Sequence, residues 1–323
     1  MLMKIEHTTE MNYSGLINET VMEMRMAPRQ ERWQHRLSFD LAIGPAASVR
    51  NYFDWLGNTV HAFAVTGLHR NIKIVATSVV LTSNRGRSPG DLPDSWPLPV
   101  QSDYALTDFL RLEGPVTDCA ALDQLAARIR PKGTVPLAKT ILGIMDLINS
   151  EFQYEKGVTT ASSPITEVLE HRRGVCQDFT HLMIALVRKL NVPVRYVSGY
   201  IHAGHHAYRG VAQTHAWCEV YFPTVGWVGF DPTNNCLAGD NFIKMAVGRH
   251  YRDVPPHKGV YRGSAKETME VKVHTEELPE LSPRFVGERV TMLDVPIFRP
   301  SSRGQIVPWI LDEQVEQQQQ QQQ

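Results

Sequence analysis

The stretch Gly174-Val175-Cys176-Gln177-Asp178-Phe179, with the residues that follow it, decides the fold of the second half of this chain. Hydrophobic residues then recur in steps of three and four, at Phe179, Leu182, Met183, Leu186, Val187 and Leu190. This spacing predicts a helix that buries one stripe of its surface. Basic residues in the last turn, followed by Asn191 and Pro193, are typical of a helix end. We therefore expect a helix that begins near Cys176.

Cys176 falls in the first turn of this predicted helix. The helix dipole and the exposed backbone N–H groups favour a thiolate there, and the same N–H groups can hold a developing oxyanion. The alternative is structural, because free cysteines usually behave as small buried apolar residues. Asp178, in the same turn, either perturbs the thiol or favours the helix start, and we prefer the structural role.

Length and composition are those of a soluble globular protein. The 323 residues are enough for two domains, and 42% hydrophobic and 21% charged residues are ordinary values. A formal net charge of −1 gives no reason to expect nucleic acid or a membrane as partner. No apolar run reaches the roughly 18 residues that span a bilayer, and the first residues lack a signal-peptide core. The four cysteines show no CxxC spacing, so we expect reduced thiols and a cytoplasmic protein.

Residues 1–82 are predicted to form a β-rich domain. Polar and apolar residues alternate at 22–26 and at 37–43, and further β-rich runs follow. Several short strands at this spacing suggest a small β-sandwich. Residues 83–100 contain many prolines and glycines and are expected to be a linker.

Residues 101–275 are predicted to form a second domain of the α+β class. Its expected elements are helices at 122–129 and 137–148, the Cys176 helix, and strands at 194–201, 215–221 and 226–231. The last two strands are expected to form a hairpin, and alternating residues at 270–274 to close the domain as an edge strand. Residues 276–323 are expected to be an extended tail, which ends in seven glutamines.

The predicted hairpin places an imidazole and a carboxylate on one face. Alternate side chains of a strand share a face, so His215 lies with Trp217, Glu219 and Tyr221. If Tyr221 pairs with Trp227, Asp231 becomes the diagonal neighbour of His215, about 7–8 Å away at Cα. A hydrogen bond between them would fix the tautomer that a catalytic base requires. A β-bulge in either strand would move one of the two residues to the opposite face.

Each of the three residues also has a structural interpretation when it is taken alone. His215 could be a half-buried histidine with satisfied hydrogen bonds, and Asp231, before Pro232, could simply end its strand in a turn. A thiol at a helix start, an imidazole and a carboxylate on adjacent strands together predict a Cys-His-Asp triad. Trp217 and Trp227 share the predicted catalytic face, where they either line a substrate groove together with Asp178 or pack in the core.

At these residues the sequence resembles the transglutaminase-like superfamily, and its bacterial branch in particular. The similar blocks are 174–179, Tyr196-Val197-Ser198-Gly199-Tyr200, His215-Ala216-Trp217-Cys218-Glu219-Val220 and 226–234, in the order that the family has them. The element Asp54-Trp55-Leu56-Gly57-Asn58 and residues 248–256 extend the resemblance to about residues 1–275.

The resemblance implies a papain-like α+β core with Cys176 as nucleophile, His215 as base and then acid, and Asp231 orienting His215. Members of the superfamily cross-link glutamine to amines, hydrolyse amides, act as proteases, or have lost activity. We expect a protein or peptide substrate with amide or γ-glutamyl groups, and hydrolysis through a thioester. Transamidation, or peptide binding without catalysis on the same fold, are the alternatives.

Two departures from animal transglutaminases limit what the resemblance implies. Those enzymes use an upstream tryptophan to hold the oxyanion, and here none lies nearer before Cys176 than Trp96. The N–H of Cys176 is therefore the first candidate donor, and a second is not identified. They are also calcium-activated, but no Asp-x-Asp-x-Asp-Gly loop occurs here, so we expect no metal and no cofactor. His202, His205 and His206 could suggest zinc, but their loose spacing favours a loop that borders the cleft.

Overall fold

The computed structural model describes residues 1–83, 88–99, 103–204, 208–209, 214–282, 287–302 and 304–309. The chain divides into two compact units, and each combines segments that are distant in sequence. The core unit consists of Met1 and residues 28–35 and 82–255, and the β unit consists of residues 2–27, 36–81 and 256–323. Among the described residues, no helix has the length and apolar character needed to cross a membrane.

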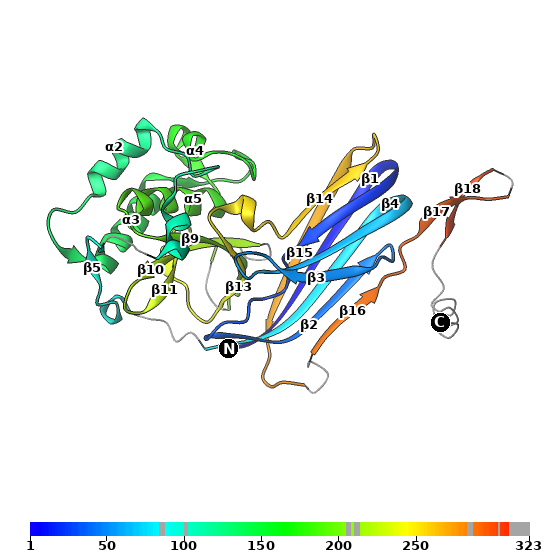
Figure 1. Cartoon of the computed structure of the whole chain (residues 1–323), viewed down its shortest axis with the longest axis horizontal. Coiled ribbons are helices and arrows are strands. Elements are labelled where there is room, and N and C mark those ends of the chain that lie inside the picture. Colours follow the sequence, from blue (N-terminus) through cyan, green and yellow to red (C-terminus); the bar gives the residue numbers. More distant parts are fainter. Residues whose placement is uncertain are drawn as a thin grey trace. The chain divides into compact units, whose positions relative to one another are not determined.

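The core unit is a mixed α+β structure in which helices pack on an antiparallel sheet (Figure 1). Its α-helices are α1 (Tyr104–Thr107), α2 (Ala120–Ile129), α3 (Leu137–Glu151), α4 (Ile165–His171) and α5 (Cys176–Lys189). The sheet has the order β12-β11-β10-β9-β13, formed by β9 (Val194–Ile201), β10 (His215–Phe222), β11 (Gly226–Asp231), β12 (Cys236–Leu237) and β13 (Phe242–Gly248). Short pairs join β5 (Ser95–Trp96) to β6 (Val135–Pro136), and β7 (Gln153–Tyr154) to β8 (Arg173–Gly174). Single 3-10 turns occur at Pro89–Asp91, Asp108–Leu110 and Tyr251–Asp253.

The helix predicted at Cys176 is α5, and it lies at the centre of the hydrophobic core. Its apolar stripe is fully buried against α2, α3 and α4 and against the inner face of β9 and β10. Each large apolar side chain buried in this way stabilises the fold by about 1.5–3 kcal/mol. The helix ends as predicted, because Asn191 adopts a left-handed conformation (φ 58°) just before Pro193.

Arg188, one of the two basic residues in the last turn of α5, is buried. Its guanidinium donates four hydrogen bonds to backbone carbonyls, those of Phe109 (3.0 Å), Arg111 (2.6 Å), Val194 (3.1 Å) and Arg249 (2.7 Å). Burial lowers the pKa of Arg188 to about 10, so the group remains charged at neutral pH. Because a guanidinium carries five N–H donors in one plane, it can join α5 to three neighbouring segments at once.

The segment predicted as a linker contributes to the core unit wherever it is described. Leu92 and Leu98 are buried in the hydrophobic core, and Trp96 in β5 donates a hydrogen bond from Nε1 to the carbonyl of Leu190 (2.9 Å). The prolines and glycines of this stretch therefore shape a packed connection, and residues 84–87 and 100–102 lie outside the described residues.

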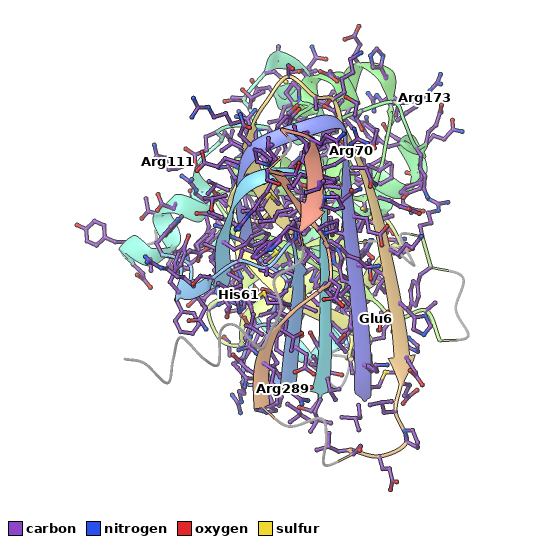
Figure 2. The ribbon with its side chains drawn as sticks, turned by 90° about the vertical axis from the view of Figure 1, so that its right-hand side faces the viewer. Glu6, His61, Arg70, Arg111, Arg173 and Arg289 are labelled. Carbon is purple, nitrogen blue, oxygen red and sulfur yellow. The ribbon has the colours of Figure 1, made fainter. Side chains whose placement is uncertain are left out.

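The β unit is built on two long antiparallel strands, β1 (Leu2–Met24) and β4 (Thr59–Thr82). Its other strands are β2 (Gln34–Gly44), β3 (Val49–Phe53), β14 (His257–Arg262), β15 (Glu267–Glu277), β16 (Gly287–Met292), β17 (Ile297–Pro300) and β18 (Ile306–Trp309). In Figure 2, β1 can be found by Glu6, β4 by His61 and β16 by Arg289. Among the described residues these strands form one hydrogen-bonded sheet of nine strands. The prediction of short strands was wrong, because β1 has 23 residues and β4 has 24, and the two pair along most of their length. The small β-sandwich stays a prediction.

The boundaries predicted after residue 255 also differ from the structure. Residues 256–275, assigned to the catalytic domain, belong to the β unit, because β14 pairs with residues 19–24 of β1 and β15 pairs with residues 3–13. The alternation at 270–274 correctly indicated a strand, but a local pattern does not identify the partner strand. Part of the expected extended tail forms β16, β17 and β18, while the glutamines at 317–323 lie outside the described residues.

Candidate active site

The hairpin β10–β11 has the register predicted from the sequence. Tyr221 lies opposite Trp227, and the ladder continues to Cys218 opposite Phe230. His215 begins β10 and Asp231 ends β11, so both residues lie at the same end of the hairpin. Nε2 of His215 is 2.8 Å from Oδ2 of Asp231, and both side chains are completely buried. Because a carboxylate can only accept, Nε2 carries the proton and donates it.

Asp231 is held by the turn that follows it. Its Oδ1 accepts hydrogen bonds from the backbone N–H groups of Thr233 (2.9 Å) and Asn234 (3.4 Å), and its Oδ2 accepts one from Nδ2 of Asn234 (2.7 Å). Asp231 is therefore the strand-ending turn residue of the structural interpretation and the partner of His215 at the same time. Sequence reasoning assigned no role to Asn234, which fixes the carboxylate from two sides.

Burial and the charge of Asp231 act in opposite directions on the pKa of His215. Burial alone lowers the pKa of this imidazole, but the charge and hydrogen bond of Asp231, helped by the Cys176 side chain, raise the pKa to about 10. The imidazolium form is thus stabilised at neutral pH. Among the described residues, Nδ1 of His215 makes no hydrogen bond of normal geometry, and the Cys176 side chain is the group besides Asp231 that raises the pKa of the ring.

Cys176 is the first residue of α5, and its side chain is half-buried. Val175 before it is extended (φ −114°, ψ −174°), so the first N–H groups of the helix have no partners within the helix itself. The Cys176 side chain interacts with the ring of His215 and contributes to the raised pKa of that ring. The structure therefore brings Cys176, His215 and Asp231 together from one helix and two strands.

Asp178 is buried at the start of α5 and does not line the cavity that Trp217 and Trp227 line, contrary to the substrate-groove role considered for it. Its side chain is 1% exposed, and its Oδ2 accepts hydrogen bonds from the N–H of Val175 (2.8 Å) and from Oγ1 of Thr159 (2.6 Å). A Cβ on Gly174 would lie 2.7 Å from Cβ of Asp178, so only glycine allows this approach. Burial raises the pKa of Asp178, and the two hydrogen bonds oppose that rise. Asp178 thus fixes the start of α5, which is the structural role expected.

Trp217 and Trp227 both line a cavity of about 380 Å³ inside the core unit. Trp217 is almost completely buried, its ring stacks on His215 at 6.2 Å between centroids, and it contacts Phe242 at 5.2 Å. Trp227 contacts the guanidinium of Arg195 at 4.5 Å. Cys176, His215 and Asp231 do not line this cavity, so a substrate-groove role of the two tryptophans stays a prediction.

The same cavity contains a charged network that sequence reasoning missed. Glu219 is buried and forms ion pairs with Arg195 (2.6 Å) and Lys244, and Lys244 also contacts Glu31 at 2.6 Å. Burial raises the pKa of Glu219, but the charges of Lys244 and Arg195 outweigh burial and hold the pKa below its usual value. The alternation of the strand placed Glu219 on this face, but the cations come from other strands and could not be assigned from sequence.

Among the described residues, no group of three or more His, Cys, Asp and Glu side chains is arranged to hold a metal ion. His202 is half-buried at the end of β9, while His205 and His206 lie outside the described residues. The expectation that the protein needs no metal stays a prediction.

Comparison with known proteins gives a family for both halves of the chain. Residues 123–232 match the transglutaminase-like superfamily, and residues 3–81 match the bacterial transglutaminase-like N-terminal region. The uncharacterised protein Rv2569c of Mycobacterium tuberculosis is 32% identical over 289 residues, which cover 84% of this chain and 91% of that protein. A protein-glutamine gamma-glutamyltransferase of Pseudomonas aeruginosa is 28% identical over 149 residues, which cover 43% of this chain and 22% of that protein.

A solved structure shares the fold. The crystal structure of a candidate cysteine protease from Cytophaga hutchinsonii superposes with a TM-score of 0.70 at 24% identity, covering 88% of this chain and 93% of that one. The fold is therefore a mixed α+β structure with a transglutaminase-like core. This chain belongs to the transglutaminase-like superfamily, with a bacterial transglutaminase-like N-terminal region before the superfamily core.

Proposed function

We propose that this protein is an enzyme that transfers the acyl group of an amide through a thioester on Cys176. The observation that supports this most is the buried hydrogen bond of 2.8 Å between His215 and Asp231, next to the thiol at the start of α5. A charged, oriented imidazole beside a thiol is the arrangement that activates a cysteine nucleophile. Its protein or peptide substrate carries amide or γ-glutamyl groups, as its membership of the superfamily suggests.

The first half-reaction forms the thioester. The Cys176 thiolate attacks the amide carbon, an S–C bond forms, and the π pair of the carbonyl moves to oxygen. The N–H of Cys176 at the helix start can stabilise this oxyanion. When the electron pair on the oxyanion re-forms the C=O bond, the C–N bond breaks. His215 gives its Nδ1 proton to the leaving amine or ammonia. Asp231 keeps the ring oriented and balances its charge while it is protonated.

The second half-reaction releases the acyl group. Neutral His215 takes a proton from water, whose oxygen attacks the thioester carbon, and collapse breaks the S–C bond to give a carboxylic acid and the Cys176 thiolate. His215 ends protonated, so the site returns to its starting state. A primary amine in place of water would give a new amide instead, which is transamidation.

Hydrolysis of peptide or isopeptide bonds is the outcome that we favour. Transamidation is the second candidate, and the similarity to the gamma-glutamyltransferase of Pseudomonas aeruginosa supports keeping it. A peptide-binding module without catalysis is a third candidate from another class. The buried His215–Asp231 pair argues against it, because binding alone does not require an imidazole held by a buried carboxylate beside a thiol.

Turnover of chromogenic amide and γ-glutamyl substrates tests this proposal. The unsubstituted protein should release the chromophore and show a mass increase on Cys176 when the reaction is quenched early, whereas Cys176→Ala should do neither. Cys119→Ala is the matched control, because Cys119 lies at the start of α2, and it should keep full activity. Incorporation of a fluorescent amine into a glutamine-rich protein would identify transamidation. No turnover of any such substrate, with Cys176 unmodified, would overturn the proposal.

A further inference from the structure

The proposed chemistry requires more than one hydrogen-bond donor for the oxyanion, because a single donor leaves much of the charge uncompensated. The N–H of Cys176 is one donor, and no tryptophan close before Cys176 in sequence can supply the second. The inference below rests on the proposed function and concerns the same site. Tyr154, to which sequence reasoning gave no role, lies close to this site.

The backbone of Tyr154 is fixed beside the segment that leads into α5. In the parallel pair of β7 with β8, Tyr154 lies opposite Gly174, two residues before Cys176. The residues on either side of it are hydrogen-bonded across this pair, Gln153 N–H to the carbonyl of Arg172 (2.8 Å) and Glu155 N–H to the carbonyl of Gly174 (2.9 Å). The position of Tyr154 relative to the helix start is therefore set by the backbone.

The ring of Tyr154 packs over the first turn of α5. It meets Phe179 edge to face, with 6.2 Å between centroids and an interplanar angle of 79°. The guanidinium carbon of Arg209 lies 5.6 Å from the centroid of the same ring. Arg209 is in turn tied to the triad, because its backbone N–H donates to Oδ1 of Asn234 (2.8 Å), and Asn234 holds Asp231. Two contacts thus fix the ring next to the catalytic residues.

The phenol lies within electrostatic range of the reacting groups. Burial, followed by the Cys176 side chain, raises the pKa of Tyr154 to about 12, and Asp178 and Asp231 add to this while Arg209 opposes it. The hydroxyl therefore keeps its proton at every pH at which the site would work, and it can act as a donor. Within the described part of the chain, the hydroxyl makes no hydrogen bond to another residue.

A second tyrosine near the thiol is less suitable. Cys176 also raises the pKa of Tyr196, after the larger effect of burial. Tyr196, however, is 1% exposed, and its ring packs between His181 (5.1 Å) and Tyr251 (6.3 Å) in the core. Tyr154 is only half-buried, so a substrate can reach it.

We propose that the hydroxyl of Tyr154 is the second donor to the oxyanion of the tetrahedral intermediate formed on Cys176. As the S–C bond forms and the π pair moves to the carbonyl oxygen, the O–H of Tyr154 and the N–H of Cys176 both donate to that oxygen. Tyr154 keeps its proton throughout, and both hydrogen bonds weaken when the pair returns and the amine leaves. Tyr154 is thus a catalytic residue in place of the upstream tryptophan of animal transglutaminases.

Tyr154→Phe tests this inference, since it removes the oxygen and retains the ring that packs on Phe179. We expect kcat for amide hydrolysis to fall about a hundredfold or more with little change in KM, as for the loss of one oxyanion donor. A peptide aldehyde, whose hemithioacetal oxygen occupies the same place, should bind more weakly by a similar factor. Iodoacetamide should alkylate Cys176 at an unchanged rate, because that displacement creates no oxyanion. Tyr221→Phe, a phenol on β10 that packs on Trp227 at 5.3 Å, is the matched control and should change none of these values.

The outcomes separate this inference from the proposed function. If the unsubstituted protein is active and Tyr154→Phe stays within threefold of it in kcat and aldehyde affinity, Tyr154 is not an oxyanion donor, while the proposed function stands. If Tyr154→Phe slows alkylation as much as turnover, its role is structural, and the inference is equally overturned. If the unsubstituted protein shows neither turnover nor rapid alkylation of Cys176, the proposed function fails and this inference fails with it.

Discussion

At the scale of single residues, the geometry of the candidate active site depends on Asp231. Its carboxylate both anchors the turn after β11 and orients His215. The strand period, together with the assumed pairing of Tyr221 with Trp227, placed His215 and Asp231 on one face, and the structure has this register. Asn234 holds Asp231, and Tyr154 lies beside the segment that leads into α5. Both arrangements depend on tertiary contacts, so no local sequence pattern predicts them.

Asp231→Asn should change the protonation of His215 while it preserves the volume of the side chain. Without the negative charge, burial lowers the pKa of the imidazole, so the alkaline limb of the activity profile should move from near pH 10 toward neutral pH. By analogy with other triads, kcat should fall by roughly 10³–10⁴. Rates of turnover and of Cys176 alkylation as a function of pH measure both effects.

Asp146→Asn is the matched control, since Asp146 lies at the surface and accepts from Nδ2 of Asn235, next to the same turn. It should leave the pH profile unchanged. If Asp231→Asn retains both its rate and its alkaline limb, the carboxylate does not act on His215 in the way we describe.

At the scale of elements, α5 contributes both to the stability of the core unit and to the candidate active site. Its first residue is Cys176, and its last turn contains the buried Arg188. The apolar spacing was sufficient to predict the helix and both of its ends. It was not sufficient to predict that Arg188 is buried, because a cation in the last turn is equally expected on the surface. The carbonyls that bind it come from segments up to 79 residues away in the sequence.

Arg188→Met should destabilise the core unit by more than about 3 kcal/mol, because four buried carbonyls lose their donors. Arg188→Lys should have an intermediate effect, since an ammonium keeps the charge but reaches fewer of the carbonyls. Urea unfolding followed by tryptophan fluorescence provides the measurement. Arg173→Met, at an exposed position in β8, serves as the control, and a loss below 1 kcal/mol for Arg188→Met would show that the buried network adds little.

At the scale of the whole molecule, two units could be predicted, but their boundaries could not. Alternation indicated strands at 37–43 and 270–274, yet the pairing of β15 with β1 joins residues more than 250 positions apart. The alternation of polar and apolar residues in a strand specifies which of its residues are buried. It does not specify which other strand pairs with it. The final segments were therefore assigned to the wrong unit or to no unit.

Among the described residues of the β unit, His7, His61 and His69 are buried, and the titration of His7 and His61 should make the unit sensitive to acid. Burial lowers the pKa of His7 and of His61 from 6.5 to about 4, with smaller effects of neighbouring charges. Because the folded pKa values lie below the unfolded value, the stabilisation is complete above pH 6.5 and is lost as the pH falls toward 4. Two pH units in this window correspond to roughly 2–3 kcal/mol for each group.

His61→Leu should reduce the difference in unfolding free energy between pH 7 and pH 4.5 by about 2 kcal/mol, whatever its effect at pH 7. Denaturant unfolding at the two pH values gives this difference directly. His35→Leu, at an exposed position, should leave it unchanged. An undiminished difference for His61→Leu would mean that other groups are responsible for the acid sensitivity.

The most direct test of the account is the rate at which iodoacetamide alkylates each cysteine near pH 7, followed by peptide mapping. We predict that Cys176 is labelled first and that His215→Ala slows its labelling markedly. Cys236 should react slowly, because burial, and then Asp231, raise the pKa of its thiol to about 12. Labelling of Cys236 before an inert Cys176, or a rate at Cys176 that does not depend on His215, would contradict the proposed catalytic site.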